Sequence, residues 1–177
     1  MINKSELVFA VDEDNNPIEP VERRKAHQQG IWHRTTDIAV VNSKKEILVS
    51  KRSMLKDSSP GLWDGAFGGH ILAGVEPVMG AIEELSEESG LKAQPEDLEF
   101  VAINKFISRN QKNKEFRYFY IYRWDGEIND LKLETDEIDE AEWVTSEFLK
   151  TNRDNSQEWV PLPYLDQLLM KIENERS

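Results

Sequence analysis

The segment from Gly68 to Leu91 constrains this chain more than any other part of its sequence. It opens with two glycines and predicts a helix that begins at Pro77 and ends before Gly90. Proline suits the first turn of a helix, where its missing N–H costs nothing. Glycine suits the position just past a helix end. The segment is therefore expected to form a glycine-rich loop followed by one helix.

The predicted helix has two contrasting faces. At about 100° per residue, one face is apolar and can pack on a sheet: Val78, Ile82 and Leu85. The other face carries three glutamates at positions i, i+3 and i+4: Glu84, Glu87 and Glu88. Such neighbours repel one another by a few tenths of a kcal/mol per pair, and a divalent cation with oxygen ligands relieves that repulsion. The helix alone allows either a solvated acidic face or a magnesium site.

The charge and cysteine content narrow the function classes. The 177 residues include 34 acidic and 22 basic side chains, a net charge of −12, which disfavours a nucleic-acid partner. A small anionic ligand would need a cation to neutralise it. The chain has no cysteine, which excludes disulfides, thiol nucleophiles and cysteine-bound zinc. No apolar run is long enough for a membrane helix, and the start lacks a signal peptide, so a cytoplasmic location is expected.

The rest of the chain predicts a mixed sheet flanked by helices, an α/β architecture. We expect a helix over 21–29, a hairpin from 38–41 and 47–51, strands over 100–107, 116–124 and 143–144, and a C-terminal helix over 161–173. We predict that residues 1–30 form a strand and helix appended to one domain over 31–177.

The segment from Gly68 to Leu91 resembles the Nudix box, a pattern of Gly, five residues, Glu, seven residues, then Arg-Glu-apolar-x-Glu-Glu-x-Gly-apolar. Gly69 matches the first glycine, and the stretch from Glu84 to Leu91 matches the distal half in register. The resemblance implies an α/β/α sandwich with a mixed central sheet. It also implies Mg²⁺ or Mn²⁺ bound by a set of ligands comprising Glu84, Glu87, Glu88 and the carbonyl of Gly69.

Two positions depart from the box. The first glutamate of the pattern falls at Val75, and the arginine falls at Glu83. In the family these two side chains form an ion pair that braces the loop on the helix. Both members of the pair are absent here. The chain therefore avoids the energetic cost of leaving one charged member without its partner. With these departures, the match to the box supports the fold more strongly than it supports hydrolysis.

A wider resemblance, over roughly residues 5 to 150, is to the Nudix group that includes isopentenyl-diphosphate isomerase and its hydrolase relatives. It is carried by the segments 12–24, 27–37, 51–53 and 60–64. The cysteine that the isomerase requires falls at Gly68, so we do not expect isomerisation of isopentenyl diphosphate.

The same resemblance implies a possible second metal site at His33, His70 and Glu115, with His27 close to the place of a third histidine. Three imidazoles and a carboxylate would suit Mn²⁺ or Zn²⁺. The alternative is that these side chains only satisfy local hydrogen bonds.

Two further groups of residues are candidates for substrate chemistry. Arg52 and Lys51 are expected to bind phosphate, since the planar guanidinium fork of arginine matches phosphate oxygens; the alternative is a solvated strand end. Glu87 and Glu137 are the expected catalytic carboxylates. Either Glu137 or Glu134 would take a proton from water, unless this acidic loop only confers solubility.

The resulting hypothesis is a metal-dependent hydrolase of a diphosphate-linked small molecule. Its rival is a non-catalytic Nudix-fold module with a degenerate box that binds or senses a ligand. A small phosphorylated substrate and a possible homodimer are expected, with no nucleic-acid or membrane partner.

Overall fold

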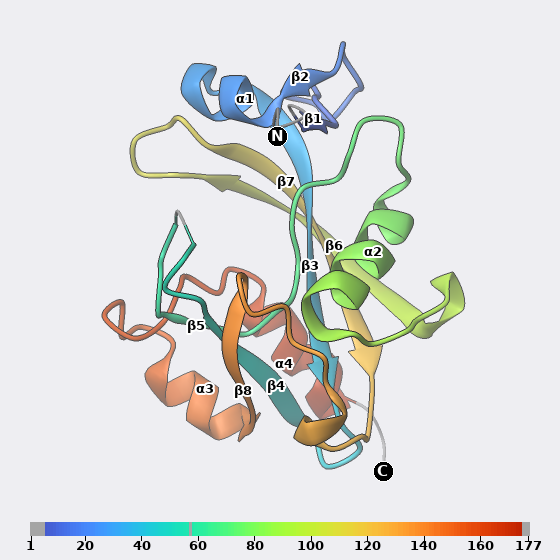
Figure 1. The fold of residues 1–177 in the computed structure, drawn as a ribbon, viewed down its shortest axis with the longest axis vertical. Coiled ribbons are helices and arrows are strands. Elements are labelled where there is room, and N and C mark those ends of the chain that lie inside the picture. Colours follow the sequence, from blue (N-terminus) through green and yellow to red (C-terminus); the bar gives the residue numbers. More distant parts are fainter. Residues whose placement is uncertain (1–5, 57, 175–177) are drawn as a thin grey trace.

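The computed structural model describes residues 6–56 and 58–174, which form a mixed six-stranded sheet with helices on both faces (Figure 1). The strand order is β5-β4-β3-β7-β6, with β8 paired to β4. The central pair β3 and β7 is parallel, and the other pairs are antiparallel. The strands are β3 (Trp32–Val41), β4 (Glu46–Arg52), β5 (Trp63–Asp64), β6 (Leu98–Ile107), β7 (Lys114–Arg123) and β8 (Ile138–Thr145).

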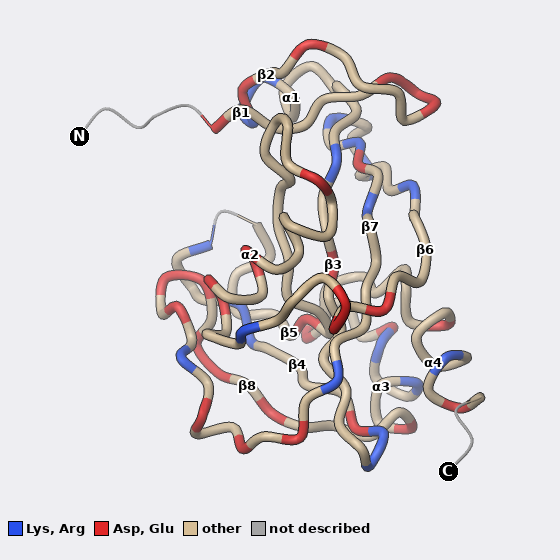
Figure 2. Tube along the Cα trace, turned by 90° about the vertical axis from the view of Figure 1, so that its right-hand side faces the viewer, with Lys and Arg blue, Asp and Glu red and all other residues tan. Residues whose placement is uncertain are grey.

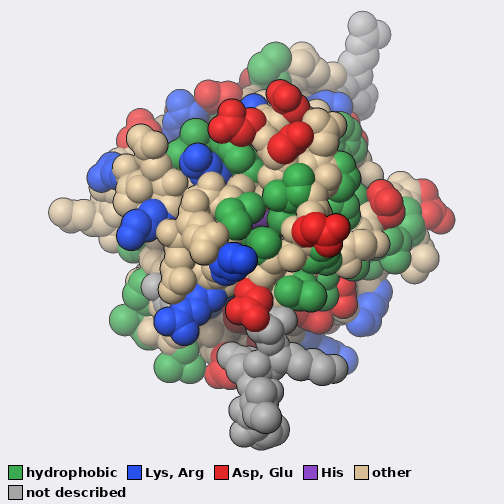
Figure 3. Space-filling view, turned by 90° about the horizontal axis from the view of Figure 1, so that it is seen from above, with side chains coloured by type: hydrophobic (Ala, Val, Ile, Leu, Met, Phe, Trp, Pro, Cys, Tyr) green, Lys and Arg blue, Asp and Glu red, His purple; other side chains and the backbone are tan. Residues whose placement is uncertain are grey.

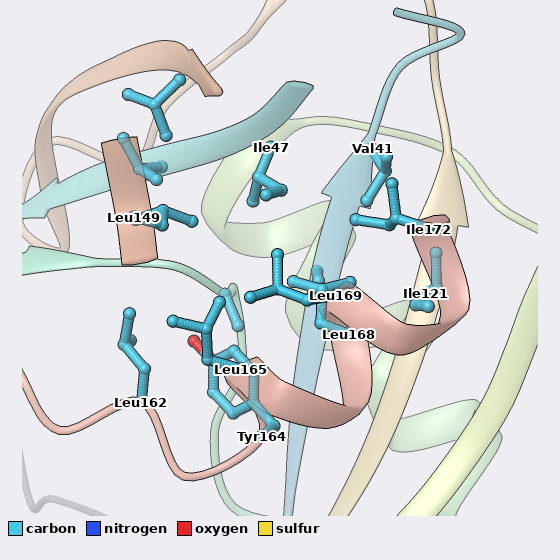
Figure 4. Close-up of a cluster of buried hydrophobic side chains, with 14 of the residues drawn as sticks. Val41, Ile47, Ile121, Leu149, Leu162, Tyr164, Leu165, Leu168, Leu169 and Ile172 are labelled. Atoms are coloured by element: carbon cyan, nitrogen blue, oxygen red, sulfur yellow. The ribbon is translucent and has the colours of Figure 1, made fainter. Parts of the chain in front are cut away.

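Helix α2 (Pro77–Ser89) covers one face of the sheet through Ala81 and Leu85, both fully buried. Its bounds match the predicted helix, and Gly90 closes it in the left-handed conformation at φ 76°. Helices α3 (Ser146–Asn152) and α4 (Leu165–Asn174) cover the other face, where α4 buries four apolar side chains against β3, β4 and β7 (Figure 4). Short 3₁₀ turns lie at Pro95–Asp97 and Ile128–Asp130. The predicted α/β/α sandwich is confirmed.

An N-terminal unit of β1 (Leu7–Val8), β2 (Val21–Glu22) and α1 (Arg23–Gln29) sits at the top of the molecule in Figure 1. The Phe9 N–H donates to the carbonyl of Ile71 at 2.8 Å, and the Arg34 N–H donates to the carbonyl of Phe9 at 2.9 Å. The unit is thereby hydrogen-bonded both to β3 and to the chain that follows the two glycines.

The predicted hairpin of β3 and β4 pairs only next to its turn. Val40 lies opposite Leu48 and Val41 opposite Ile47, and beyond these pairs the strands separate. The glycine-rich segment from Phe67 to His70 lies along the edge of β3 that β4 leaves unpaired. Single bridges join Ile38 to Phe67 and Thr35 to His70. The sheet is therefore open between β3 and β4.

Several elements differ from their predicted bounds. The predicted helix over 21–29 begins only at Arg23, because Val21 and Glu22 pair with β1 as strand β2. Strand β8 covers Ile138–Thr145 rather than 143–144, because the acidic residues before Trp143 also pair with β4. Helix α4 begins at Leu165 rather than at residue 161, after Pro161 and Pro163, two residues that favour extended backbone before them. No helix in residues 6–56 and 58–174 combines the length and the apolar character needed to cross a membrane.

Candidate functional site

A pocket of about 1040 Å³ occupies the opening between β3 and β4 and extends to α2. Its walls come from α2, the end of β4, the glycine-rich segment and the loop before β8, and its top from the N-terminal unit. The pocket is at the upper end of the size range of small-molecule sites. Its lining is mostly charged and polar, which fits a phosphorylated ligand better than an apolar one.

The predicted carboxylates of α2 all line this pocket. Glu84 is half-buried, Glu87 is exposed and Glu88 is 9% exposed. Burial, together with repulsion from Glu88 and Glu87, raises the pKa of Glu84 to about 8. Burial raises the pKa of Glu88 to about 7, against the hydrogen bond that its Oε2 accepts from the Gly68 N–H at 2.9 Å. Carboxylates that resist ionisation in this way are stabilised by a bound cation.

Gly69 lies directly against Glu84. A Cβ atom at position 69 would lie 2.4 Å from Oε1 of Glu84, so any larger residue there would displace the Glu84 carboxylate. The carbonyl of Gly69 accepts a hydrogen bond from the Thr36 N–H at 2.9 Å. A carbonyl oxygen has two lone pairs, so this bond leaves one available for the cation ligation predicted from the sequence.

The raised pKa of Glu84 leads to a testable pH dependence. The folded protein holds a proton that an unfolded glutamate, with a pKa of about 4.3, has already lost at pH 7. The metal-free protein should therefore lose stability as the pH rises from 7 to 9, by about 1 kcal/mol. The histidines are neutral in both states over most of this range. Urea unfolding in EDTA at pH 7, 8 and 9 measures the slope.

The variant Glu84→Gln should remove most of that slope, whereas Glu76→Gln, an exposed residue at the start of the same helix, should keep it. A wild-type stability that stays constant from pH 7 to 9 would contradict the expectation.

Three histidines and one glutamate converge at the top of the pocket. The Nε2 atom of His27 lies 3.3 Å from that of His33 and 3.1 Å from that of His70. One ligand atom from each of these rings and from Glu115 lies within 4.8 Å of all the others. The view from above shows little of the histidines, since other side chains cover them (Figure 3). The structure thus brings together His33, His70 and Glu115, and it adds His27.

The chemistry of this cluster fits a metal ion. The Nδ1 atom of His33 lies 2.9 Å from the carbonyl of Ile31, which can only accept, so Nε2 presents its lone pair to the cluster. One Nε2 atom of His27 cannot bond both neighbours, since each ring nitrogen has a single donor or acceptor site. The two separations from Nε2 of His27, 3.3 Å and 3.1 Å, are close to the edge of about 3.4 Å in a tetrahedral site with 2.1 Å bonds. Burial lowers the pKa of all three rings, that of His70 to about 2, which keeps them neutral as ligands.

Glu115 is held by its neighbours on β7. Its Oε1 accepts from Nδ2 of Asn113 at 2.6 Å, and its Oε2 accepts from Nε of Arg117 at 2.7 Å. Partners of this kind orient a ligand for a metal.

Metal binding at the histidine cluster can be separated from binding at α2. In a protein that carries Glu84→Gln and Glu88→Gln, saturating Mn²⁺ should still raise the melting temperature, by mass action on the folded state. Adding His27→Ala should remove most of that rise. Gln28→Ala, the exposed neighbour on α1, is the matched control and should leave it unchanged. A rise that survives His27→Ala would argue against the cluster.

Two cations face the carboxylates from the opposite wall, and only one of them was predicted. Arg52 lines the pocket, where it donates to Ser58 and lies 3.6 Å from Asp64. Lys56 also lines it and is close enough to lower the pKa of both Glu84 and Glu88. The loop position of Lys56 gave no sequence pattern that could single it out.

The structure places Lys51 outside the pocket, in contrast to its predicted role. Its Nζ atom pairs with Glu140 at 3.0 Å and lies over the ring of Trp63. Neighbouring strand residues point to opposite faces, and Arg52 takes the pocket side. Lys51 is therefore dropped as a phosphate-binding candidate.

The acidic stretch before and along β8 lines the pocket at Glu134, Asp136 and Glu137. Figure 2 shows the acidic positions along this stretch in red. Glu137 forms an ion pair with Lys56, and the Glu134 N–H donates to the carbonyl of Glu88 at 3.1 Å. The stretch is thus joined to the end of α2, and the predicted base Glu137 lies at the pocket.

The lower part of the pocket holds charged residues that the sequence did not single out. Asp37 from β3 lies 3.9 Å from Nη1 of Arg117, and burial raises its pKa to about 6. Burial also raises the pKa of Asp64, whose Oδ1 accepts from the hydroxyl of Tyr164 at 3.4 Å. In a strand, every second residue points to the same face. Asp37 lies four residues after His33, so the sequence could have placed both on the pocket face of β3.

The two departures from the box lie away from the pocket lining. Glu83 is exposed on α2 and makes no ion pair among the described residues, and Val75 is half-buried. Lys56 is close enough to lower the pKa of both Glu84 and Glu88, and Arg52 lowers that of Glu88.

The chain belongs to the Nudix family. Residues 31–165 match the NUDIX domain model. An uncharacterised Nudix hydrolase of Clostridium acetobutylicum is 35% identical over 140 residues, which are 76% of this chain and 68% of that protein. An isopentenyl-diphosphate Delta-isomerase of Serratia proteamaculans is 29% identical over 121 residues, 68% of each chain.

Solved structures share the fold. A protein from Deinococcus radiodurans superposes with a TM-score of 0.71 at 21% identity, over 93% of this chain and 98% of that one. The NUDIX domain of Shewanella oneidensis NrtR, solved with ADP-ribose, superposes with a TM-score of 0.60 at 15% identity, over 79% of this chain and 86% of that one.

Proposed function

We propose that this protein is a metal-dependent pyrophosphatase that cleaves the diphosphate bond of a small molecule. The observation that carries the proposal is the pocket itself, in which three carboxylates of α2 face Arg52 and Lys56. Carboxylates alone would repel a diphosphate and cations alone would not activate water. Together they match a diphosphate bound with a divalent cation. The ADP-ribose in the related NrtR domain is a ligand of this chemical kind.

Each group of residues has a distinct role in the proposed reaction. Glu84, Glu87 and Glu88, with the carbonyl of Gly69, would hold Mg²⁺ or Mn²⁺, which neutralises phosphate charge and lowers the pKa of water when bound. Arg52 and Lys56 would bind phosphate oxygens. Glu137 would accept the proton of the attacking water. The histidine cluster would hold a second cation, Mn²⁺ or Zn²⁺.

The direct test is hydrolysis of a panel of diphosphate compounds with Mg²⁺ or Mn²⁺. The panel includes nucleoside diphosphate esters, whose monoester products release phosphate on phosphatase treatment, and diphosphate monoesters, which release phosphate directly on cleavage. Cleavage that needs the divalent cation supports the proposal, and a panel that stays intact with both cations contradicts it.

A non-catalytic binding module is the second candidate, and the missing box pair at Val75 and Glu83 favours it. Restoring both members distinguishes the two. If the protein is a weakened hydrolase, Val75→Glu with Glu83→Arg should raise kcat/KM by about tenfold, or ~1.4 kcal/mol, and by more than the single changes combined. Arginine alone at position 83 has no partner and would compete with the cation. A double variant that folds, binds Mn²⁺ and cleaves nothing would favour the binding module.

A further inference from the structure

The bottom of the pocket differs chemically from the walls. We define the pocket floor as Thr35 and Asp37 of β3, Asp64 of β5 and Arg117 of β7, all of which line the pocket. Directly beneath it lies Tyr164, whose hydroxyl donates to Asp64 and whose ring stacks on Phe119 at 4.6 Å. Figure 4 shows Tyr164 among the buried side chains of the core. The floor is thus the polar boundary between the pocket and the core.

Two polar atoms of the floor have no hydrogen-bond partner in the described chain. Thr35 is only 5% exposed, and its Oγ1 atom is buried without a partner. The Oδ2 atom of Asp37 is in the same state, because Nη1 of Arg117 lies 3.9 Å away, beyond hydrogen-bond distance. Leaving a buried polar group without a hydrogen bond destabilises the folded state. The floor therefore needs a ligand or water to satisfy it.

Arg117 has unused donors that face the same space. Its Nε donates to Glu115, and its guanidinium lies 4.0 Å from the centre of the Phe106 ring. The described residues accept no hydrogen bond from its two terminal nitrogens. These contacts fix the guanidinium plane, so its free donors have a defined direction.

The combination selects one kind of chemical group. Aspartates only accept hydrogen bonds, arginine only donates, and threonine does both. A ligand hydroxyl donates to a carboxylate and accepts from a guanidinium, so it satisfies both. An alkyl group would leave the floor unpaired, and a further phosphate would meet Asp37 and Asp64.

We propose that the pocket floor binds a hydroxyl-bearing group of the substrate and thereby selects hydroxylated diphosphate esters over alkyl ones. This inference rests on the proposed function, because it assumes that the diphosphate lies between α2 and the cations Arg52 and Lys56. Thr35, Asp37 and Arg117 are the specificity-determining residues.

The test compares two five-carbon diphosphates, ribose 5-diphosphate and pentyl diphosphate. Wild-type protein should cleave the ribose compound with a kcat/KM at least about tenfold higher, because a site built for hydroxyls rejects analogues that lack them. Thr35→Val keeps the shape of the side chain and should lower this ratio about tenfold. Asp37→Asn should also lower it and serves as a second variant if Thr35→Val does not fold.

Thr36→Val is the matched control, since the Thr36 hydroxyl donates to the carbonyl of Tyr118 at 3.3 Å. It should act on both compounds equally and leave the ratio unchanged. A wild-type ratio near one, or a ratio that neither Thr35→Val nor Asp37→Asn changes, would overturn the inference while the hydrolase proposal stands.

Absence of cleavage has a separate meaning. If neither compound is cleaved with Mg²⁺ or Mn²⁺, the hydrolase proposal loses support, and the inference is then tested by calorimetry of the same two compounds. Tighter binding of ribose 5-diphosphate that weakens in Thr35→Val would support the floor, and equal binding would refute it.

Discussion

Replacing Glu84 and Glu88 together by glutamine should lower the rate of diphosphate hydrolysis by about a thousandfold, or ~4 kcal/mol. Glu84 is half-buried and Glu88 is buried in the pocket wall. Burial raises the pKa of both, and repulsion from Glu88 and Glu87 raises that of Glu84 further. Glutamine keeps their size and one acceptor oxygen but removes the charge that would attract Mg²⁺. Hydrolysis rates and calorimetric titration with Mn²⁺ measure the effect.

The metal-free form of this double variant should unfold at a higher urea concentration than the wild type, because neutral amides remove the repulsion in the wall. Glu76→Gln removes one charge from the same helix outside the pocket and should change neither Mn²⁺ affinity nor rate. Equal Mn²⁺ affinity in the wild type and the double variant would refute the assignment of these glutamates as ligands.

Gly68→Ala should destabilise the protein by about 4 kcal/mol or more, a large part of a typical domain's stability. A Cβ atom at this position would lie 2.0 Å from the carbonyl oxygen of Thr36 and 2.9 Å from its carbonyl carbon. These are backbone atoms of the central strand β3, which cannot move aside as a flexible side chain can. The backbone also has φ +156°, which side chains rarely adopt.

Gly74→Ala separates the clash from the backbone strain. Gly74 has φ +81°, but a Cβ atom added there would meet no other atom within 4 Å, so its change should cost only about 1–2 kcal/mol. Urea unfolding of the two variants gives the comparison. Similar losses would mean that β3 adjusts to the added methyl group. The same clash predicts that Gly68→Cys would not supply the thiol of the isomerase without a shift of β3.

Local signals predicted α2 well because they act within the helix. Pro77 and Gly90 fix its ends, and the 3.6-residue repeat fixes which side packs on the sheet. The positions of Glu84, Glu87 and Glu88 on the opposite face of the helix follow from the same repeat. The spacing of the box was therefore sufficient to place one wall of the site.

The wall of the pocket that carries Arg52 and Lys56 could not be predicted from local sequence signals. The sequence alone does not distinguish Lys51 from Arg52, because both are basic and they are adjacent. The register of β4 against β8 shifts between them, and that shift depends on the tertiary structure. Lys56 reaches the carboxylates through a loop whose path depends on β4 and the stretch before β8. His27 joins the other histidines only because the N-terminal unit is hydrogen-bonded to β3 and to the segment after Gly69.

The position of that N-terminal unit has a consequence for how this domain could be moved between proteins. A cassette cut at residues 31 and 165 would carry the sheet and α2 but omit His27. It would also lose Leu168, Leu169 and Ile172, which seal the core under the pocket floor. Recombination at those borders would transfer the box without His27 and without part of the core beneath the pocket floor. A functional transfer of this domain would therefore have to include the segments before residue 31 and after residue 165 together with the box.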